Sequence, residues 1–246
     1  MPAPAYNRPS LIRKRLRNAL RGYRLTVFIG CLLIAALATI GSVVAILADD
    51  SSASPEVCVT LDLATASTVR VSQGGGVGSG FLISESVLVT NEHVVSGATT
   101  VTLQFADGST GTGAVIHSPS DFDVAVVHLH EPKPGLGLPW SLKPARRGQP
   151  VTFIGFPRGI RGAPVVREGL ILSVDNPMFK GYYWLDFPAE PGNSGGPILN
   201  DCGHVIGIVT AGQRYAVELG FAIPATDARP HVEKLTANLP TPTPAP

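Results

Sequence analysis

Three short segments carry residues whose types suit nucleophilic catalysis. A histidine, His93, follows a short apolar run, and an aspartate, Asp123, directly precedes another. A serine, Ser194, lies within the glycine-rich sequence Gly-Asn-Ser-Gly-Gly-Pro at 192–197. A serine hydroxyl is a poor nucleophile until a neighbouring base takes its proton. We therefore predict that these three side chains form a catalytic triad.

The predicted roles follow from the chemistry of the three groups. His93 is expected to accept the Ser194 proton, because a neutral imidazole is a suitable base near pH 7. Asp123 is expected to bind the other ring nitrogen of His93, which fixes the tautomer and stabilises the imidazolium. Asp121 is a rival for this role, since it lies two residues earlier on the same face of a strand. The position of Asp123 directly before the apolar run favours Asp123.

The glycine-rich turn is also expected to supply an oxyanion hole. The carbonyl oxygen of a substrate becomes negative during attack and needs preorganised hydrogen-bond donors. The backbone N–H groups of Gly192 and Ser194 can provide them, and the neighbouring Gly195 and Gly196 permit unusual backbone angles. This chemistry is nucleophilic attack on a carbonyl group through an acyl-enzyme, and no cofactor is expected.

Short β-strands are the elements that must position these residues. The chain of 246 residues contains 27 glycines and 22 prolines, and its apolar runs are brief, which favours an all-β domain with many turns. Residues 100–105 alternate apolar and polar side chains and are followed by a turn, as in a half-buried strand. Further strands are expected at 81–83, 87–90, 114–117, 124–129, 151–154, 165–174, 182–187, 205–210 and 220–223.

These strands fall into two sets of roughly six, joined by a long connection at 131–149 that is rich in proline, glycine and basic residues. They predict two packed six-stranded antiparallel β-barrels, at about 62–135 and 148–226. A short C-terminal helix is expected from Asp227, a candidate N-cap, to Leu239. The whole domain is placed at 62–238, and a Pro-rich tail follows at 239–246.

The three segments resemble the chymotrypsin-like (trypsin-like) serine proteases, and more closely their Deg-type, high-temperature-requirement branch. The branch has motifs similar to Thr-Asn-Glu-His-Val-Val at 90–95, to Asp-Val-Ala-Val at 123–126 and to the serine segment at 192–197. Phe-Ile-Gly-Phe-Pro at 153–157 and Gly-Phe-Ala-Ile-Pro at 220–224 resemble two further strand motifs of the branch.

The chain order His, Asp, Ser agrees with that superfamily and differs from the order in subtilisins and α/β-hydrolases. The resemblance covers about residues 66–228. It implies the two-barrel fold and serine-type endopeptidase activity on proteins or peptides.

Two departures from the branch carry further expectations. Deg-type enzymes usually have a PDZ domain after the protease, whereas only 21 residues follow Ala225, so no PDZ domain is expected in this chain. Digestive relatives have an aspartate before the nucleophile that pairs with a newly cut N-terminus. This chain has Asn193 there, so the resemblance implies no activation by cleavage of that type.

The resemblance also places a pocket for the substrate residue before the scissile bond. Pro188 falls at its base, where trypsin-type enzymes carry a specificity aspartate, and Thr210, Ala211 and Gly212 border it together with the segment before Ser194. We expect a small or medium apolar residue there rather than Arg or Lys. The nearby charged residues Asp186 and Glu190 either shape this pocket or are solvated loop charges.

The first 50 residues predict a membrane anchor. Residues 25–47 carry no charge, and as a helix they would span roughly 34 Å, enough for a bilayer core of about 30 Å. The basic arm at 1–24 contains seven cations and no acid, which places the N-terminus in the cytoplasm and the domain outside. The alternative is a cleaved secretory signal, with Val43 and Ala45 as the best small-residue cleavage pattern. A linker at 48–61 would follow the anchor.

The three cysteines and six histidines predict no metal site, because none has ligand spacing. Cys31 lies within the apolar segment, while Cys58 and Cys202 both lie in the exported part, where an even pair suggests a disulfide. The branch typically has no disulfide, so the resemblance does not support this pair. Without its basic arm the chain is mildly acidic, which gives a nucleic-acid partner no electrostatic support.

The function expected from the sequence is a membrane-anchored, extracytoplasmic serine endopeptidase that processes exported proteins or controls their quality. One alternative is a catalytically latent binding module on the same fold. A lipid-binding peripheral protein is a third hypothesis, but it depends only on the arm and the apolar segment and explains none of the motifs.

Overall fold

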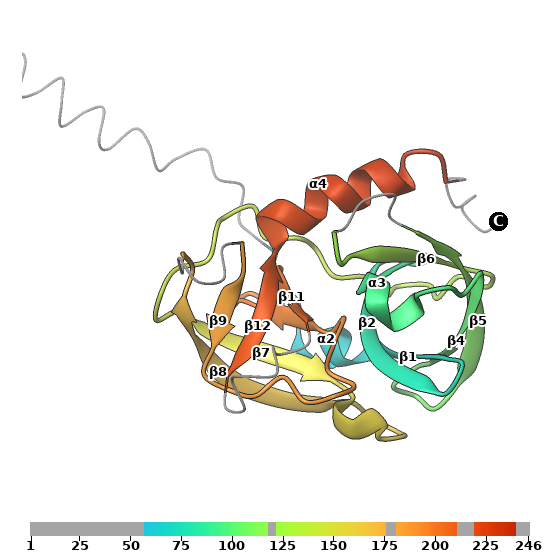
Figure 1. Ribbon diagram of the computed structural model, residues 1–246, viewed down its shortest axis with the longest axis horizontal. Coiled ribbons are helices and arrows are strands. Elements are labelled where there is room, and N and C mark those ends of the chain that lie inside the picture. The colour runs from blue at the N-terminus through green and yellow to red at the C-terminus, as the bar shows by residue number, and fades with distance from the viewer. Residues whose placement is uncertain (1–56, 118–121, 176–180, 211–218, 240–246) are drawn as a thin grey trace, which may run out of the picture. The chain divides into compact units, whose positions relative to one another are not determined.

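The structure, a computed structural model, describes residues 57–117, 122–175, 181–210 and 219–239 (Figure 1). The expected basic arm and membrane segment lie outside these residues, as do most of the linker and nearly all of the Pro-rich tail. Among the described residues, no helix has the length and apolar character needed to span a bilayer.

The first barrel closes six antiparallel strands in the order β1-β2-β3-β6-β5-β4. Small or apolar residues alternate inward along its strands, and side chains such as Leu82, Leu88 and Leu103 are fully buried. The strands are β1 (Thr68–Gln73), β2 (Gly76–Ser84), β3 (Val87–Thr90), β4 (Thr100–Gln104), β5 (Thr110–Ile116) and β6 (Ala125–Leu129).

The second barrel closes six more antiparallel strands in the order β10-β11-β12-β9-β8-β7. Phe153, Ile171 and Leu185 are among the buried side chains of its core. The strands are β7 (Pro150–Gly155), β8 (Val165–Ser173), β9 (Tyr183–Leu185), β10 (Pro197–Leu199), β11 (Val205–Thr210) and β12 (Gly220–Pro224).

A shared apolar core joins the two barrels. It combines Phe81 and Val126 of the first barrel with Ile154 and Ile208 of the second. Helix α4 (Ala225–Thr236) follows β12 directly and contacts β11, β12 and β6, so it lies against both barrels (Figure 1). The other short helices are α2 (Leu61–Ala66), α3 (Glu92–Val95) and the 3₁₀ turn η1 (Pro157–Gly159).

The two six-stranded barrels and the C-terminal helix confirm the predicted architecture, with differences in detail. The helix begins at Ala225, with Pro224 at the N-cap position, rather than at Asp227. Asp227 lies instead in the first turn, where its negative charge interacts favourably with the positive end of the helix dipole. Strand β1 and helix α2 were not predicted, because the motifs begin only at β2 and six residues are too few for a clear helical period.

A disulfide joins Cys58 to Cys202 across 144 residues of sequence, with 4.4 Å between the two Cα atoms. A backbone hydrogen bond joins the same two segments, since the Val59 N–H donates to the Cys202 carbonyl at 2.8 Å. The segment that leads into α2 is thereby held on the turn between β10 and β11 of the second barrel.

Candidate active site

Strand pairing in the first barrel brings His93 and Asp123 together. β3 and β6 are antiparallel neighbours, and Thr90 at the end of β3 lies opposite Ala125 at the start of β6. His93 is on α3, immediately after β3, and Asp123 lies two residues before β6. The chain segments that carry the two side chains therefore leave the barrel at the same rim.

The carboxylate of Asp123 binds His93 and the hydroxyl of Thr210. His93 Nδ1 lies 2.9 Å from each oxygen of Asp123, and the His93 N–H donates to Oδ1 at 3.1 Å. Thr210 Oγ1 donates to Oδ2 at 2.8 Å. Burial alone would raise the pKa of Asp123, but the hydrogen bonds and charge of His93, with the Thr210 hydroxyl, hold that pKa below its usual value. Asp123 is therefore ionised near neutral pH and able to orient the imidazole.

Ser194 lies in the loop between β9 and β10, and bonds from both barrels fix that loop. The Ser79 N–H on β2 donates to the Ser194 carbonyl at 2.8 Å. The Gly195 N–H donates to the Val209 carbonyl at 2.8 Å, which ties the loop to β11. The Ser194 side chain is buried to 6% exposure at the junction of the barrels.

Two backbone N–H groups beside Ser194 are available to a ligand. Neither the Gly192 N–H nor the Ser194 N–H donates to an acceptor within the described parts of the chain. Gly192 has a φ of +94°, and a Cβ there would overlap the Phe156 carbonyl and approach the Gly159 nitrogen, so only glycine fits. Free donors next to a serine are what an oxyanion hole requires.

His93 and Ser194 line one cavity of about 410 Å³ together with Gly76, Val77 and residues 189–192. The structure has no hydrogen bond between the His93 ring and the Ser194 hydroxyl, although both side chains are described. Such bonds are often long in unliganded enzymes and tighten when substrate binds. The cavity is open to solvent on the side of His93, whose side chain is 44% exposed.

The predicted substrate pocket stays a prediction. Ala211 and Gly212 lie outside the described residues, as does Asp121, the rival of Asp123. Pro188 and Thr210 are described but do not line the cavity at Ser194. Two charged residues near the serine have definite partners: Asp186 Oδ1 accepts from the Leu170 N–H at 2.7 Å, and Glu190 forms an ion pair with Arg158.

Three polar residues hold the site in ways that the sequence did not indicate. Thr210 was expected in the substrate pocket, but its hydroxyl binds Asp123. The Asn91 amide donates to the Asp123 carbonyl at 2.7 Å. The Ser79 hydroxyl donates to the Gly192 carbonyl at 2.6 Å. Asn91 belongs to the histidine motif at 90–95 and Ser79 precedes the predicted strand at 81–83, so the only signal for either residue was its place beside those segments.

No candidate metal site is found in the part of the chain that the structure describes. No group of three or more His, Cys, Asp or Glu side chains there is arranged to hold a metal ion.

The comparisons with known proteins agree with this geometry. The model of the trypsin-like peptidase domain matches residues 78–208. The HhoB protein of Synechocystis sp. is 37% identical over 171 residues, which are 65% of this chain and 40% of that protein. The Do-like serine protease HtrA of Bacillus subtilis is 31% identical over 179 residues, which are 65% and 39% of the two chains.

The serine protease Rv3671c of Mycobacterium tuberculosis is similar in both sequence and structure. It is 32% identical over 173 residues, which are 66% of this chain and 43% of that protein. A crystal structure of an inactive form of Rv3671c gives a TM-score of 0.62 at 26% identity and covers 78% of this chain and 98% of that one.

The chain spans less than half the length of the curated relatives it matches. The family model nevertheless covers more than half of the chain, from β2, which precedes His93, to β11, which follows Ser194. The chain therefore belongs to the trypsin-like peptidase family, and its relatives are serine proteases of the HtrA/Deg type.

Proposed function

We propose that this chain is a serine endopeptidase that hydrolyses peptide bonds through an acyl-enzyme, with His93, Asp123 and Ser194 as its triad. The observation that carries the proposal is the contact of His93 Nδ1 with both oxygens of Asp123 at 2.9 Å, beside a buried serine in the same cavity. A partly buried carboxylate on one imidazole nitrogen leaves the other free to act as a base toward Ser194.

The mechanism follows from these positions. Ser194 Oγ attacks the substrate carbonyl carbon while His93 Nε2 takes the hydroxyl proton. The Gly192 and Ser194 N–H groups stabilise the negative oxygen. His93 then returns the proton to the leaving amine as the carbon–nitrogen bond breaks. Water attacks the resulting ester by the same route, which releases the new carboxylate and restores Ser194.

The first test is covalent labelling of the full-length chain, solubilised in detergent, with a fluorophosphonate probe. We expect labelling in the wild type, none in Ser194→Ala, and a rate lower by roughly three to four orders of magnitude in Asp123→Asn. Asp121→Asn is the matched control and should label normally. A folded wild-type chain that does not label would contradict the proposed activity.

A second candidate function is a latent, protease-like binding module. A hydrogen bond between the His93 ring and the Ser194 hydroxyl is absent among the described residues, as it would be in such a module and as it often is in an unliganded enzyme. Labelling separates the two candidates: an endopeptidase reacts with the probe, whereas a binding module remains unlabelled under every activating condition.

We further propose that residues 25–47 anchor the protease on the outer face of a membrane, where it processes exported proteins or controls their quality. The support is the uncharged length of this segment and the seven cations before it. The full chain should stay in carbonate-washed membranes, and a chain that lacks residues 1–48 should not. If the full-length chain is expressed but a shorter form with its N-terminus near Ala45 is released from the membrane, the segment is a cleaved signal instead.

The preferred substrate residue before the scissile bond is proposed to be small or medium and apolar, because the resemblance puts Pro188 where trypsin-type enzymes carry a specificity aspartate. Digestion of a random peptide library, with the cut sites read by mass spectrometry, measures this preference. Cleavage mainly after Arg or Lys would contradict it.

A further inference from the structure

A second cavity adjoins the candidate active site, and two arginines line it. This cavity, called the basic groove below, has a volume of about 540 Å³. It shares Gly76 and Val77 with the cavity that contains His93 and Ser194. Its arginines are Arg70 on β1 and Arg161 in the loop after η1.

The two guanidinium groups have no carboxylate partner in the described parts of the chain. No acidic residue is among those that line the basic groove. Burial and then the positive charge of Arg161 lower the pKa of Arg70, which indicates that the two cations are close enough to repel each other. Arg158 on η1 differs, because its Nε binds Glu190 at 3.0 Å. The basic groove thus holds two uncompensated positive charges.

Backbone contacts connect the basic groove to the oxyanion donors. Arg70 Nε donates to the Gly159 carbonyl at 3.3 Å, which holds the partly buried side chain in place. Gly159 in turn lies close to residues that line the active-site cavity: a Cβ on Gly159 would lie 3.3 Å from the Val77 side chain, and a Cβ on Gly192 would lie 2.9 Å from the Gly159 nitrogen. One residue therefore separates the Arg70 guanidinium from the loop that carries Gly192.

The strand between the two cavities has one edge without a strand partner at Gly76 and Val77 in the described parts of the chain. Residues 76–80 of β2 pair with β1, whereas the pairing of β2 with β3 begins only at Phe81, and the Ser79 N–H already donates to the Ser194 carbonyl. An extended peptide can bind to an unpaired strand edge through backbone hydrogen bonds. The pocket for the residue before the scissile bond is expected at Thr210, which lines neither of the two cavities. A peptide that passes Gly76 and Val77 would therefore present the residues that follow the scissile bond.

We infer that the basic groove selects substrates with an acidic residue among the positions that follow the scissile bond. The inference rests on the proposed peptidase function. A carboxylate placed between Arg70 and Arg161 would receive charge-assisted hydrogen bonds and would relieve the repulsion between the two cations. The Arg158–Glu190 pair does not compete for it, since both of its charges are already neutralised.

The test is digestion of a random peptide library by the full-length chain, with the cut sites identified by mass spectrometry. We expect Asp and Glu to be enriched after the cut in the wild type. Matched peptides with Glu or Gln at the enriched position should differ about five- to tenfold in kcat/KM, and the difference should shrink at high salt.

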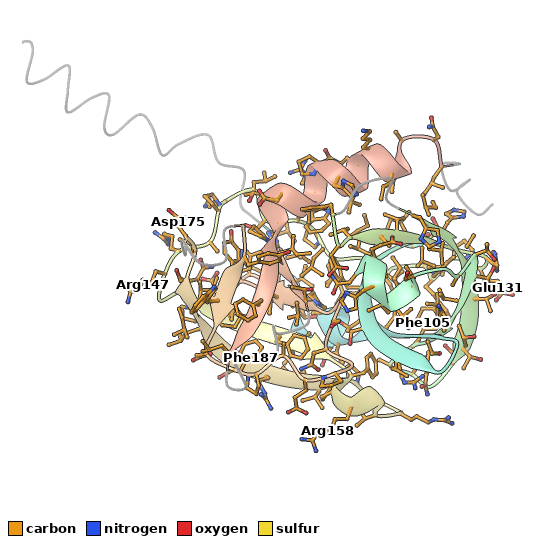
Figure 2. The ribbon with its side chains drawn as sticks, viewed as in Figure 1. Phe105, Glu131, Arg147, Arg158, Asp175 and Phe187 are labelled. Atoms are coloured by element: carbon orange, nitrogen blue, oxygen red, sulfur yellow. A yellow bond between two sulfur atoms is a disulfide. The ribbon has the colours of Figure 1, made fainter. Side chains whose placement is uncertain are left out.

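The variants Arg161→Gln and Arg70→Gln should each reduce this preference. Arg161 is exposed, so its substitution tests the inference even if the partly buried Arg70→Gln fails to fold. Arg147→Gln is the matched control, because it also removes one exposed cation. Arg147 lies far from Arg158 of η1 (Figure 2), so this variant should keep the preference for acidic residues. Arg161→Glu should reverse the preference toward Lys-containing peptides.

Fluorophosphonate labelling of the same samples separates failure of the peptidase proposal from failure of the inference about acidic substrates. Labelling with no acidic enrichment, or with an enrichment that survives in Arg161→Gln, overturns the inference and leaves the peptidase proposal intact. If no sample labels, the peptidase proposal fails, and the inference is then judged by binding. In that case, the affinity of a dye-labelled peptide with a central Glu-Glu is measured by fluorescence anisotropy. This peptide must bind the wild type more tightly than it binds Arg161→Gln, and the wild type must bind it more tightly than the matching Gln-Gln peptide. Equal affinities overturn the inference.

Discussion

Ser79 bonds to the candidate active site through its side chain and its backbone. Its hydroxyl donates to the Gly192 carbonyl at 2.6 Å and accepts from the Phe156 N–H at 3.0 Å. Its carbonyl accepts from Thr90 Oγ1 at 2.7 Å. Because it is fully buried on β2 of the first barrel, Ser79 fixes the peptide group of Gly192 relative to the rim that carries His93.

Replacement of Ser79 by alanine should lower the rate of fluorophosphonate labelling about 10- to 100-fold. The Gly192 carbonyl and the Phe156 N–H would lose their partner, and the oxyanion donors would no longer be held in place. Stability should fall by about 1–3 kcal/mol in urea unfolding. Ser173→Ala on β8 is the control. If labelling of the folded protein is unchanged, Ser79 does not position the site.

Gly195 tests how tightly the loop at Ser194 is packed. Its φ is +88°, and a Cβ there would overlap the Ser79 carbonyl and the Thr90 hydroxyl. Gly195→Ala should therefore destabilise the protein by more than about 3 kcal/mol or prevent folding. Gly74→Ala is a matched control, because Gly74 has φ +53° but nothing within 4 Å, and its cost should be about 1 kcal/mol. Similar urea midpoints for the two variants would contradict this account.

Helix α3 is too short to be stable alone, since its four residues make barely one turn. Side-chain contacts hold it where His93 is needed. His117, just after β5, lies with Nδ1 2.7 Å from Glu92 Oε1 and Nε2 2.7 Å from the Ala98 carbonyl. Both partners are acceptors, so both ring nitrogens must donate, which only the protonated imidazolium can do.

The contact between Glu92 and His117 should make stability depend on pH. The hydrogen bond to Glu92 is the main cause that raises the pKa of His117 above its ordinary value of 6.5. The stabilisation is therefore complete below about pH 6.5 and is lost as pH rises through the raised pKa. His117→Gln should cost less than about 1 kcal/mol at pH 5.5, because both groups are partly exposed, and nothing at pH 9.

Urea unfolding of the wild type and His117→Gln at the two pH values measures this difference. His130→Gln is the control, since the His130 ring contacts only the Thr112 hydroxyl among the described residues. A His117→Gln cost that is the same at both pH values would show that the contact does not involve a charged imidazole.

The two barrels form one unit through contacts that cross the whole molecule. The core shared by Phe81, Val126 and Ile208 joins their inner faces, and α4 lies against both. The disulfide between Cys58 and Cys202 adds a covalent link from the segment before α2 to the turn after β10. The candidate active site lies between the barrels, so its geometry depends on these links.

Loss of the disulfide should destabilise the folded chain by about 2–4 kcal/mol, because the bond closes a long loop and restricts the unfolded state. Urea unfolding of Cys58→Ser, or of the wild type with a reductant, measures the effect. Cys31→Ser leaves the pair intact and is the control. An unchanged urea midpoint after full reduction would mean that the backbone hydrogen bond between Val59 and Cys202 holds this segment in place without the disulfide.

The fold was predictable because most of the barrel strands have a local signature. Residues 205–210 and 87–90 are short apolar runs bounded by turns, and both are strands with those bounds in the structure. The helix start was missed because Pro224 sets the entry angle through its fixed φ, which a capping pattern at Asp227 does not reveal. Strand β1, which forms a tight hairpin with β2, was missed because the recognised motifs begin only at β2.

The chemistry of the candidate site could be inferred from sequence because its reactive residues lie in compact motifs. A histidine after one strand, an aspartate before another and a serine among glycines each need only a few neighbours to be recognised. The family, confirmed by the comparisons, was inferred from these motifs alone. Local patterns of this kind survive in the linear sequence because each one serves a single turn or strand end.

The supporting contacts needed the folded chain. The Ser79 hydroxyl reaches a carbonyl 113 residues away, and the Thr210 hydroxyl reaches a carboxylate 87 residues away. Arg70 and Arg161 lie 91 positions apart in sequence, yet they line one groove. Such contacts leave no periodic trace, because they depend on how two closed barrels pack and not on the residues next to each group.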